Sequence, residues 1–256
     1  MQILNRQYAG LRRNLIAAWL PGDGPHGQAI RNRIRSGGTG NFAANVDWSR
    51  IDGVQTVETF ANSSSYVETE NIALANQLDH NSCFSLCLWF LPNSFSSFRN
   101  LVIKRKTSSP TAINMFFNGS TIILSQYDGS KDRNVRKSGF AIGNWYFVTM
   151  TSQNGTLRGY SDGVLFGTST LSLSPVANDE PITFGRDPIL GRYMAANFGE
   201  CLLYNRTLSD TEIRKLYQLG QDKLFATQRK DVVVIPPSFR AAWVRPQNQI
   251  IGGGFS

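Results

Sequence analysis

Two acidic side chains at alternate positions are the first residues in this sequence that could do chemistry. Glu68 and Glu70 stand in the run YVETEN, so on a strand both would point to the same side. Retaining glycoside hydrolases use two carboxyl groups about 5–5.5 Å apart, one as acid and one as nucleophile. The same spacing is also typical of a solvated strand edge, and this is the interpretation that we favour.

The other side chains of catalytic type lack a supporting pattern. His26 and His80 each stand in a polar turn context, with no serine or cysteine nucleophile motif nearby. Gly-x-Ser-x-Gly and phosphate-binding loop motifs are absent from the sequence. The sequence therefore predicts a protein without an active site.

The three cysteines are interpreted as small buried hydrophobic residues. Cys83 and Cys87 would share one face of a strand about 13 Å apart, at about 3.3 Å per residue, which is too far for a disulfide. Cys201 is the third, and the spacing of the three fits no metal motif.

The elements that must position any site are short strands. Twelve are predicted, and Asn118-Gly119, Asn154-Gly155 and Asp162-Gly163 are pairs typical of tight turns between antiparallel strands. The predicted strands are 15–20, 54–60, 66–68, 83–90, 101–104, 113–117, 121–126, 145–152, 156–161, 164–167, 182–185 and 198–204. Residues 31–53 are predicted as loop with short extended pieces. This pattern predicts an all-β protein, a two-sheet antiparallel sandwich.

One short helix follows the last strand. Ser209 and Glu212 have the spacing of a capping box, and Ile213, Leu216 and Tyr217 form an apolar stripe. Gly220 stands where a left-handed residue would end the helix. On strand 198–204, Phe198, Leu202 and Tyr204 would share one face.

The net charge of +8 lies at the two ends of the chain. Residues 1–35 hold six arginines and one aspartate, and residues 219–256 hold five basic and two acidic residues, whereas residues 36–218 are neutral. A folded nucleic-acid-binding domain would carry a basic stripe on its body. Basic arms that dock on an acidic protein partner are therefore favoured over nucleic-acid binding. No apolar run approaches the roughly 18 residues of a membrane span.

Several motifs resemble a known family. FSLCLWFLP, NWYFVTMTSQNGTLRGYSDGVLFG, PITFGR and YNRTLSDTEIRKLY resemble, in this order, the successive signatures of laminin-G-like, concanavalin-A-like jelly rolls. The resemblance covers residues 15–220 and implies a jelly roll whose last strand lies beside its first and whose short helix closes the sandwich. It supports the fold more than the function, because this fold hosts lectins, glycan hydrolases, adhesion modules and virion proteins. In the glycan-cleaving members the carboxylate strand has a third carboxylate and apolar flanks, which YVETEN lacks.

Two further sites are suggested by the resemblance. Many relatives bind one calcium ion through aspartate and backbone oxygens at the rim, but aspartate beside glycine is also ordinary turn chemistry. Calcium therefore stays an open alternative to no cofactor, with Asp23, Asp52, Asp128 and Asp187 as candidate ligands. A glycan site would need exposed aromatic side chains on loops, for which Trp48, Tyr127 and Tyr193 are the candidates.

Both ends of the chain are predicted to lie outside the sandwich, as a basic arm at 1–14 and an extended arm at 221–256. The second arm is rich in apolar residues, unlike a disordered tail. Val232–Ile235 or Ala241–Val244 would add a strand to a neighbouring subunit, or the arm would wrap back on its own sandwich. The predicted partner-binding residues are Arg6, Arg12, Arg13, Val232, Val233, Val234, Ile235, Arg240, Trp243 and Arg245.

Arms of this kind around one jelly roll resemble structural proteins of tailed bacteriophages. The sequence-based prediction is therefore a non-enzymatic virion protein of the capsid-decoration or cement type, made in the host cytoplasm. It would attach through its arms to a capsid protein and form a homo-oligomer of undetermined size. The alternative is a glycan-binding lectin module for surface attachment. What separates the two is whether binding resides in the arms or in the loops.

Overall fold

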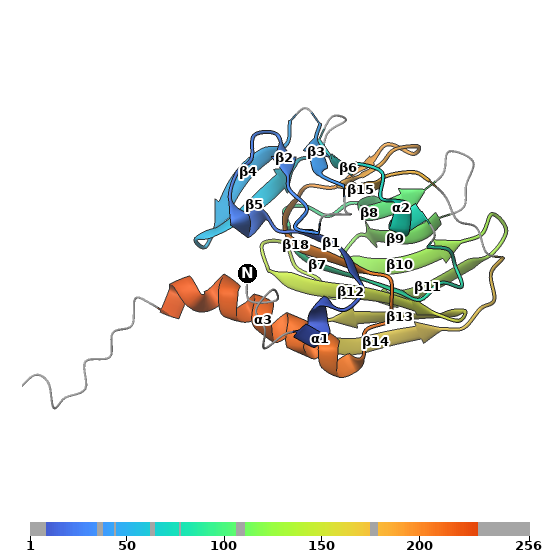
Figure 1. Ribbon diagram of the computed structural model, residues 1–256. Helices are drawn as coiled ribbons and strands as arrows, with labels where there is room; N and C mark the ends of the chain where they lie inside the picture. The colour runs from blue at the N-terminus through green and yellow to red at the C-terminus, as the bar shows by residue number, and fades with distance from the viewer. Residues whose placement is uncertain are drawn as a thin grey trace, which may run out of the picture.

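The computed structural model describes residues 9–34, 38–43, 45–61, 65–76, 78–105, 111–174 and 179–229. Two antiparallel sheets form a sandwich (Figure 1), which confirms the predicted fold class. The first sheet has the order β14 (Val164–Ser169), β13 (Thr156–Ser161), β12 (Tyr146–Gln153), β7 (Phe84–Pro92), β18 (Ala196–Tyr204), β5 (Val54–Thr59) and β4 (Asp47–Ile51), and β1 (Leu15–Trp19) also pairs with β18. The last strand therefore lies beside the first, as predicted.

The second sheet lies across the first one and completes the sandwich. Its order is β11 (Asp132–Lys137), β10 (Thr121–Tyr127), β9 (Thr111–Asn118), β8 (Arg99–Arg105), β15 (Ile182–Phe184), β6 (Val67–Thr69), β3 (Gly40–Phe42) and β2 (Ala29–Ile30). A small ribbon of β16 (Arg186–Asp187) and β17 (Arg192–Tyr193) contacts β8. The helical segments are α1 (Ala9–Arg12), η3 (Pro21–Asp23), α2 (Ala73–Asn76) and α3 (Asp210–Arg229).

The apolar side chains form two separate layers. On β7, Phe84, Leu86, Leu88 and Phe90 enter the core between the sheets, because successive side chains on a strand alternate between its faces. Trp89 points the other way, into a second cluster under α1 and α3. The central strands β7 and β18 of the first sheet are therefore buried on both faces.

The hairpin β12–β13 that later frames the candidate site forms as predicted. Its turn residues Asn154 and Gly155 have φ of 45° and 80°, the left-handed region that such two-residue turns need. Asp162 and Gly163 join β13 to β14 with φ of 54° and 79°. The short extended pieces predicted within the loop at 31–53 include β3, which pairs with β6, and β4, which pairs with β5.

Two predictions about facing residues need correction. A register shift between Phe198 and Cys201 puts Phe198 and Leu203 in the core, whereas Leu202 and Tyr204 lie in the outer cluster. The prediction that Phe198, Leu202 and Tyr204 share one face was wrong, because a β-bulge interrupts the alternation of side chains along the strand. Cys83 precedes β7 and is half-buried, whereas Cys87 and Cys201 are buried as predicted, and all three are free thiols.

The helix α3 does not end at Gly220. It continues to Arg229, so the predicted left-handed cap was wrong, and so was an extended conformation for 221–229. A Cβ on Gly220 would overlap the indole of Trp89, 2.7 Å from Cζ2, so this glycine permits close packing. Residues 230–256, with all the arm residues predicted there, lie outside the described residues.

The segment 9–14 packs on the sandwich instead of standing apart as an arm. Leu11 is buried in the outer cluster, and the guanidinium of Arg206 donates to Arg13 O (2.9 Å) and Gly10 O (3.2 Å). Arg12 and Arg13 are exposed, and Arg6 lies outside the described residues. The prediction of a free arm was wrong for this segment because it supplies an apolar side chain and two carbonyl acceptors.

Lys104 is expected to make stability depend on pH. It is 1% exposed, and its Nζ donates to Asn76 Oδ1 (3.0 Å) and to Glu180 O. Burial lowers the pKa of Lys104 to about 8, below the value of about 10.4 in an unfolded chain. Between these values the unfolded chain binds more protons, so the free energy of unfolding should rise with pH.

Urea unfolding of the wild type and of Lys104→Met between pH 7.5 and 10.5 would test this expectation. The difference in unfolding free energy, wild type minus variant, should become more favourable to the wild type as pH rises. An equal pH slope in both proteins would contradict it.

Candidate functional site

The two carboxylates predicted as a solvated pair have different partners. Glu68 Oε2 lies 3.9 Å from Arg186 Nη2, and Glu70 Oε2 accepts a hydrogen bond from Thr39 N (3.1 Å). His80 is buried, with Nε2 3.0 Å from Thr111 O, and His26 is half-buried. These residues do not come together in one site.

The candidate calcium ligands are engaged in turns and ion pairs. Asp23 pairs with Arg33, and Asp187 Oδ2 with Arg105 (2.8 Å). Backbone N–H donors of Ser174 and of the Asp128 turn hold the pKa of Asp128 well below its ordinary value. Asp52 is a turn residue with φ of 50°. In the described ranges no three His, Cys, Asp or Glu side chains gather as a metal site would require.

The three candidate glycan-binding aromatics lie on different elements. Trp48, on β4, is half-buried against Phe42 and donates from Nε1 to Gly27 O (2.6 Å). Tyr127 ends β10 and donates to Gly129 O (2.7 Å), and Tyr193 is on β17. The structure does not bring them together.

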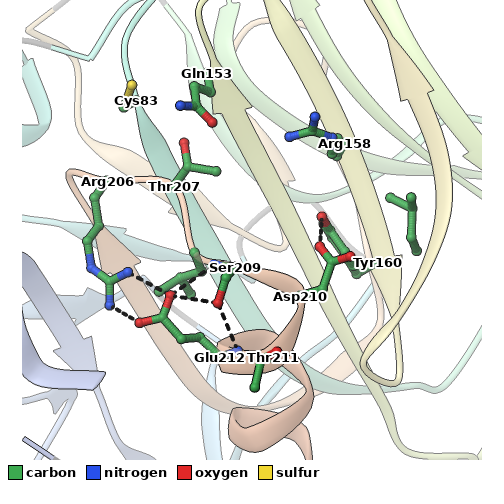
Figure 2. A pocket seen from close by; sticks show the side chains of 12 residues that line it. Cys83, Gln153, Arg158, Tyr160, Arg206, Thr207, Ser209, Asp210, Thr211 and Glu212 are labelled. Atoms are coloured by element: carbon green, nitrogen blue, oxygen red, sulfur yellow. Dashed lines mark hydrogen bonds and ion pairs between the residues drawn. The ribbon is translucent and has the colours of Figure 1, made fainter. Parts of the chain in front are cut away.

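A pocket of about 780 Å³ lies where the β12–β13 hairpin meets the start of α3 (Figure 2). Its walls come from the end of β12, from β13, from β14 and from the segment that joins β18 to α3. The lining residues are Cys83, Gln153, Arg158, Tyr160, Leu165, Arg206, Thr207, Leu208, Ser209, Asp210, Thr211 and Glu212. Polar side chains dominate, with Leu165 and Leu208 as apolar contacts.

The capping box forms one wall of this pocket. Ser209 N donates to Glu212 Oε2 (2.9 Å), and Glu212 N donates to Ser209 Oγ (3.3 Å), as predicted for this motif. Arg206 donates to both oxygens of Glu212 at 2.8 and 2.7 Å. This two-fold contact lowers the pKa of Glu212 and raises the pKa of Arg206, so both stay charged.

A second hydrogen bond fixes the carboxylate at the start of α3. Tyr160 OH donates to Asp210 Oδ1 (2.8 Å) across the pocket floor. Burial, followed by the Asp210 carboxylate, raises the pKa of Tyr160 to about 12. The phenol therefore stays protonated at neutral pH and holds Asp210 in one position.

Two donors of the lining have no hydrogen-bond or ion-pair partner in the part of the chain that the structure describes. Thr151 pairs with Arg158 and Gln153 with Thr156, so Gln153 and Arg158 are diagonal neighbours on one face of the hairpin. Figure 2 shows both side chains at the end of the pocket opposite the capping box. Within the described ranges, neither side chain forms a hydrogen bond or an ion pair.

Sequence reasoning missed this pocket because its residues come from segments far apart in the chain. The motif YNRTLSDTEIRKLY was the available signal, since it supplies seven of the twelve lining residues. The sequence predicts only that this motif closes the sandwich, whereas in the structure it both packs on the sandwich and lines the pocket.

The comparisons with known proteins agree with this fold. Residues 61–214 match the family model described as the concanavalin A-like lectin/glucanases superfamily. No curated protein matches the chain. Among the described residues, no helix is both long and apolar enough to cross a membrane.

Solved structures of clostridial toxin binding domains share the fold. The binding domain of Paraclostridial mosquitocidal protein 1 is 14% identical with a TM-score of 0.68, and the alignment covers 82% of this chain and 53% of that one. A botulinum neurotoxin type C structure, whose title ties cell entry to two ganglioside molecules, is 14% identical (TM-score 0.68; coverage 82% and 52%). The binding domain of botulinum neurotoxin DC in complex with SialylT is 15% identical (TM-score 0.63; coverage 81% and 52%).

At these identities the likeness is one of fold, and this chain spans about half the length of those structures. The family match covers more than half of the chain and follows the motifs that build the sandwich. This chain belongs to the concanavalin A-like lectin/glucanases superfamily.

Proposed function

We propose that this domain is a non-catalytic glycan-binding module and that the pocket beside α3 holds the sugar. The observation that carries the proposal is the lining, where Arg158 and Gln153, which have no hydrogen-bond or ion-pair partner among the described residues, share the pocket with the fixed carboxylate of Asp210. Each sugar hydroxyl both donates and accepts a hydrogen bond, so such a ligand needs donors and acceptors held close together. Family membership and the toxin structures with ganglioside or SialylT in their titles support this ligand class.

The two carboxylates of the pocket favour binding over glycan cleavage. A general acid needs a raised pKa, but the pKa of Glu212 is lowered by Arg206, which contacts both of its oxygens. Asp210 accepts a hydrogen bond from the phenol of Tyr160, which stays protonated, and lies in the same first turn of α3. Neither group is arranged as the acid of a hydrolase.

Blocking the pocket should abolish glycan binding. The wild type should bind saturably to at least one member of an oligosaccharide array carrying lactose, 3′-sialyllactose and a ganglioside pentasaccharide. Thr211→Trp places a large ring at the pocket wall, and since the Thr211 side chain is exposed, the fold should tolerate it. We expect at least a tenfold loss of affinity, about 1.4 kcal/mol.

The matched control is Gln218→Trp, an exposed position two turns further along α3 and outside the pocket lining. It should bind like the wild type. Absence of saturable binding across the array would contradict the glycan proposal. Equal binding by wild type and Thr211→Trp would place the sugar elsewhere on the domain.

The virion interpretation stays a prediction, as do location in the particle and homo-oligomer formation. Its partner-binding residues from Val232 to Arg245 lie outside the described residues, and so does Arg6. The docked position of 9–14 argues against a long free arm at the N-terminus. The family and the toxin structures favour the lectin alternative.

A further inference from the structure

We propose that the glycan bound in this pocket carries an acidic group, a carboxylate or a sulfate, and that Arg158 binds it. This inference rests on the proposed function and specifies the class of sugar. It begins with the four charged side chains in the lining, Arg158, Arg206, Asp210 and Glu212. Their formal charges sum to zero, but their hydrogen-bond and ion-pair partners differ.

Three of these four charges are already compensated. Arg206 and Glu212 form a two-fold ion pair, and Ser209 N also donates to Glu212. Asp210 accepts from Tyr160 OH and is the first residue of α3, where the helix dipole favours a negative charge. Arg158 is the one charged group of the lining left without a hydrogen bond or ion pair within the described residues.

The position of Arg158 suits an acidic group better than a hydroxyl. Its side chain is half-buried on β13, and the amide of Gln153 lies diagonally beside it on β12. A guanidinium offers two parallel N–H donors that match the two oxygens of a carboxylate or sulfate. Hydrogen bonds between charged groups are roughly twice as strong as neutral ones, so a neutral sugar would use this donor poorly.

The arrangement also separates the acidic group from the carboxylate of Glu212. Figure 2 shows Arg158 and Gln153 at one end and Glu212 with the capping box at the other. An acidic group at the hairpin end would leave the remaining sugar hydroxyls facing Thr207, Thr211 and Asp210. The pocket would thus bind one charged group and several hydroxyls of the same ligand.

Three lactose-based probes, two of which carry an acidic group, test this inference on the full chain. They are lactose, 3′-sialyllactose with a carboxylate, and 3′-sulfolactose with a sulfate, measured by calorimetry at low and moderate salt. The wild type should bind at least one acidic probe about tenfold or more tightly than lactose, and salt should weaken that preference. The stronger of the two acidic probes identifies the acid.

Variants at Arg158 show whether this side chain is responsible. Arg158→Gln should reduce the affinity for the acidic probe to that for lactose. Arg158→Lys should have an intermediate affinity, because lysine keeps the positive charge but lacks the two parallel N–H donors of the guanidinium. Arg136→Gln, an exposed arginine on β11 of the other sheet, is the control and should keep the full preference.

The outcomes separate the two proposals. Equal binding of all three probes, lost in Thr211→Trp, would keep the glycan function and overturn the acidic-ligand inference. An acid preference that persists in Arg158→Gln would also overturn it. No binding of any probe would overturn both proposals.

Discussion

Gly220→Ala is expected to destabilise the protein by about 1–3 kcal/mol, the range typical of an overpacked core. The new Cβ would lie 2.7 Å from Cζ2 of Trp89. The indole cannot move aside easily, because it stacks on Tyr217 (5.6 Å between ring centres) and contacts Phe147 (5.2 Å). Its own Cβ is also crowded by β18, where a Cβ on Gly199 would lie 2.9 Å away.

Whether Gly220→Ala stabilises or destabilises the protein tests the contact between this position and Trp89. At an unobstructed helix interior, replacing glycine by alanine stabilises by about 0.5–1 kcal/mol, so destabilisation requires the contact with Trp89. Urea unfolding would give the free energies, with Gln218→Ala as the exposed control on the same helix. In a Trp89→Leu background the cost of Gly220→Ala should shrink. A more stable Gly220→Ala single variant would contradict the packing described for α3.

Arg206→Met is expected to cost about 2 kcal/mol, because one side chain joins three parts of the molecule. The guanidinium binds Glu212 with two hydrogen bonds and also holds the carbonyl oxygens of Gly10 and Arg13. Hydrogen bonds to charged groups contribute about 1.5–3 kcal/mol each, and partial exposure of this side chain (18%) reduces the sum. The N-terminal segment and the first turn of α3 should both loosen.

Two measurements distinguish this role from a general loss of stability. Hydrogen exchange at the amides of Leu11–Arg13 should accelerate in Arg206→Met but not in Arg214→Met, an exposed control on α3. The part of the stabilising effect of Arg206 that comes from its ion pair with Glu212 should also disappear in acid. Because the pKa of Glu212 is lowered in the folded state, its contribution is present above about pH 4.3 and is lost as pH falls further. Unchanged exchange at 11–13 would contradict the docking of that segment.

Local rules were sufficient for much of the fold. The hairpin β12–β13 follows from alternating strands around Asn154-Gly155, and the start of α3 follows from Ser209 and Glu212. Both patterns act over a few residues, so no tertiary contact overrides them. The outer cluster was not predictable in the same way, because Gly220 looks identical in sequence whether it ends a helix or makes room for Trp89.

The candidate site was beyond sequence reasoning for a related reason. The sequence predicts exposed aromatics as the glycan contacts, but Trp48 packs against Phe42 and donates its N–H to Gly27 O. The pocket depends instead on the register of β12 and β13, which sets Gln153 beside Arg158, and on α3 docking across β13. Neither relation can be read from one segment alone.

The most direct test of the central claim is to locate a bound sugar on the folded domain. Full-length protein labelled with ¹⁵N would be titrated with 3′-sialyllactose while the backbone amide shifts are followed. The account predicts that the largest shifts gather at Gln153, Arg158 and Leu208–Glu212. Shifts centred instead on Trp48, on Tyr193 or on the outer face of the second sheet would contradict it.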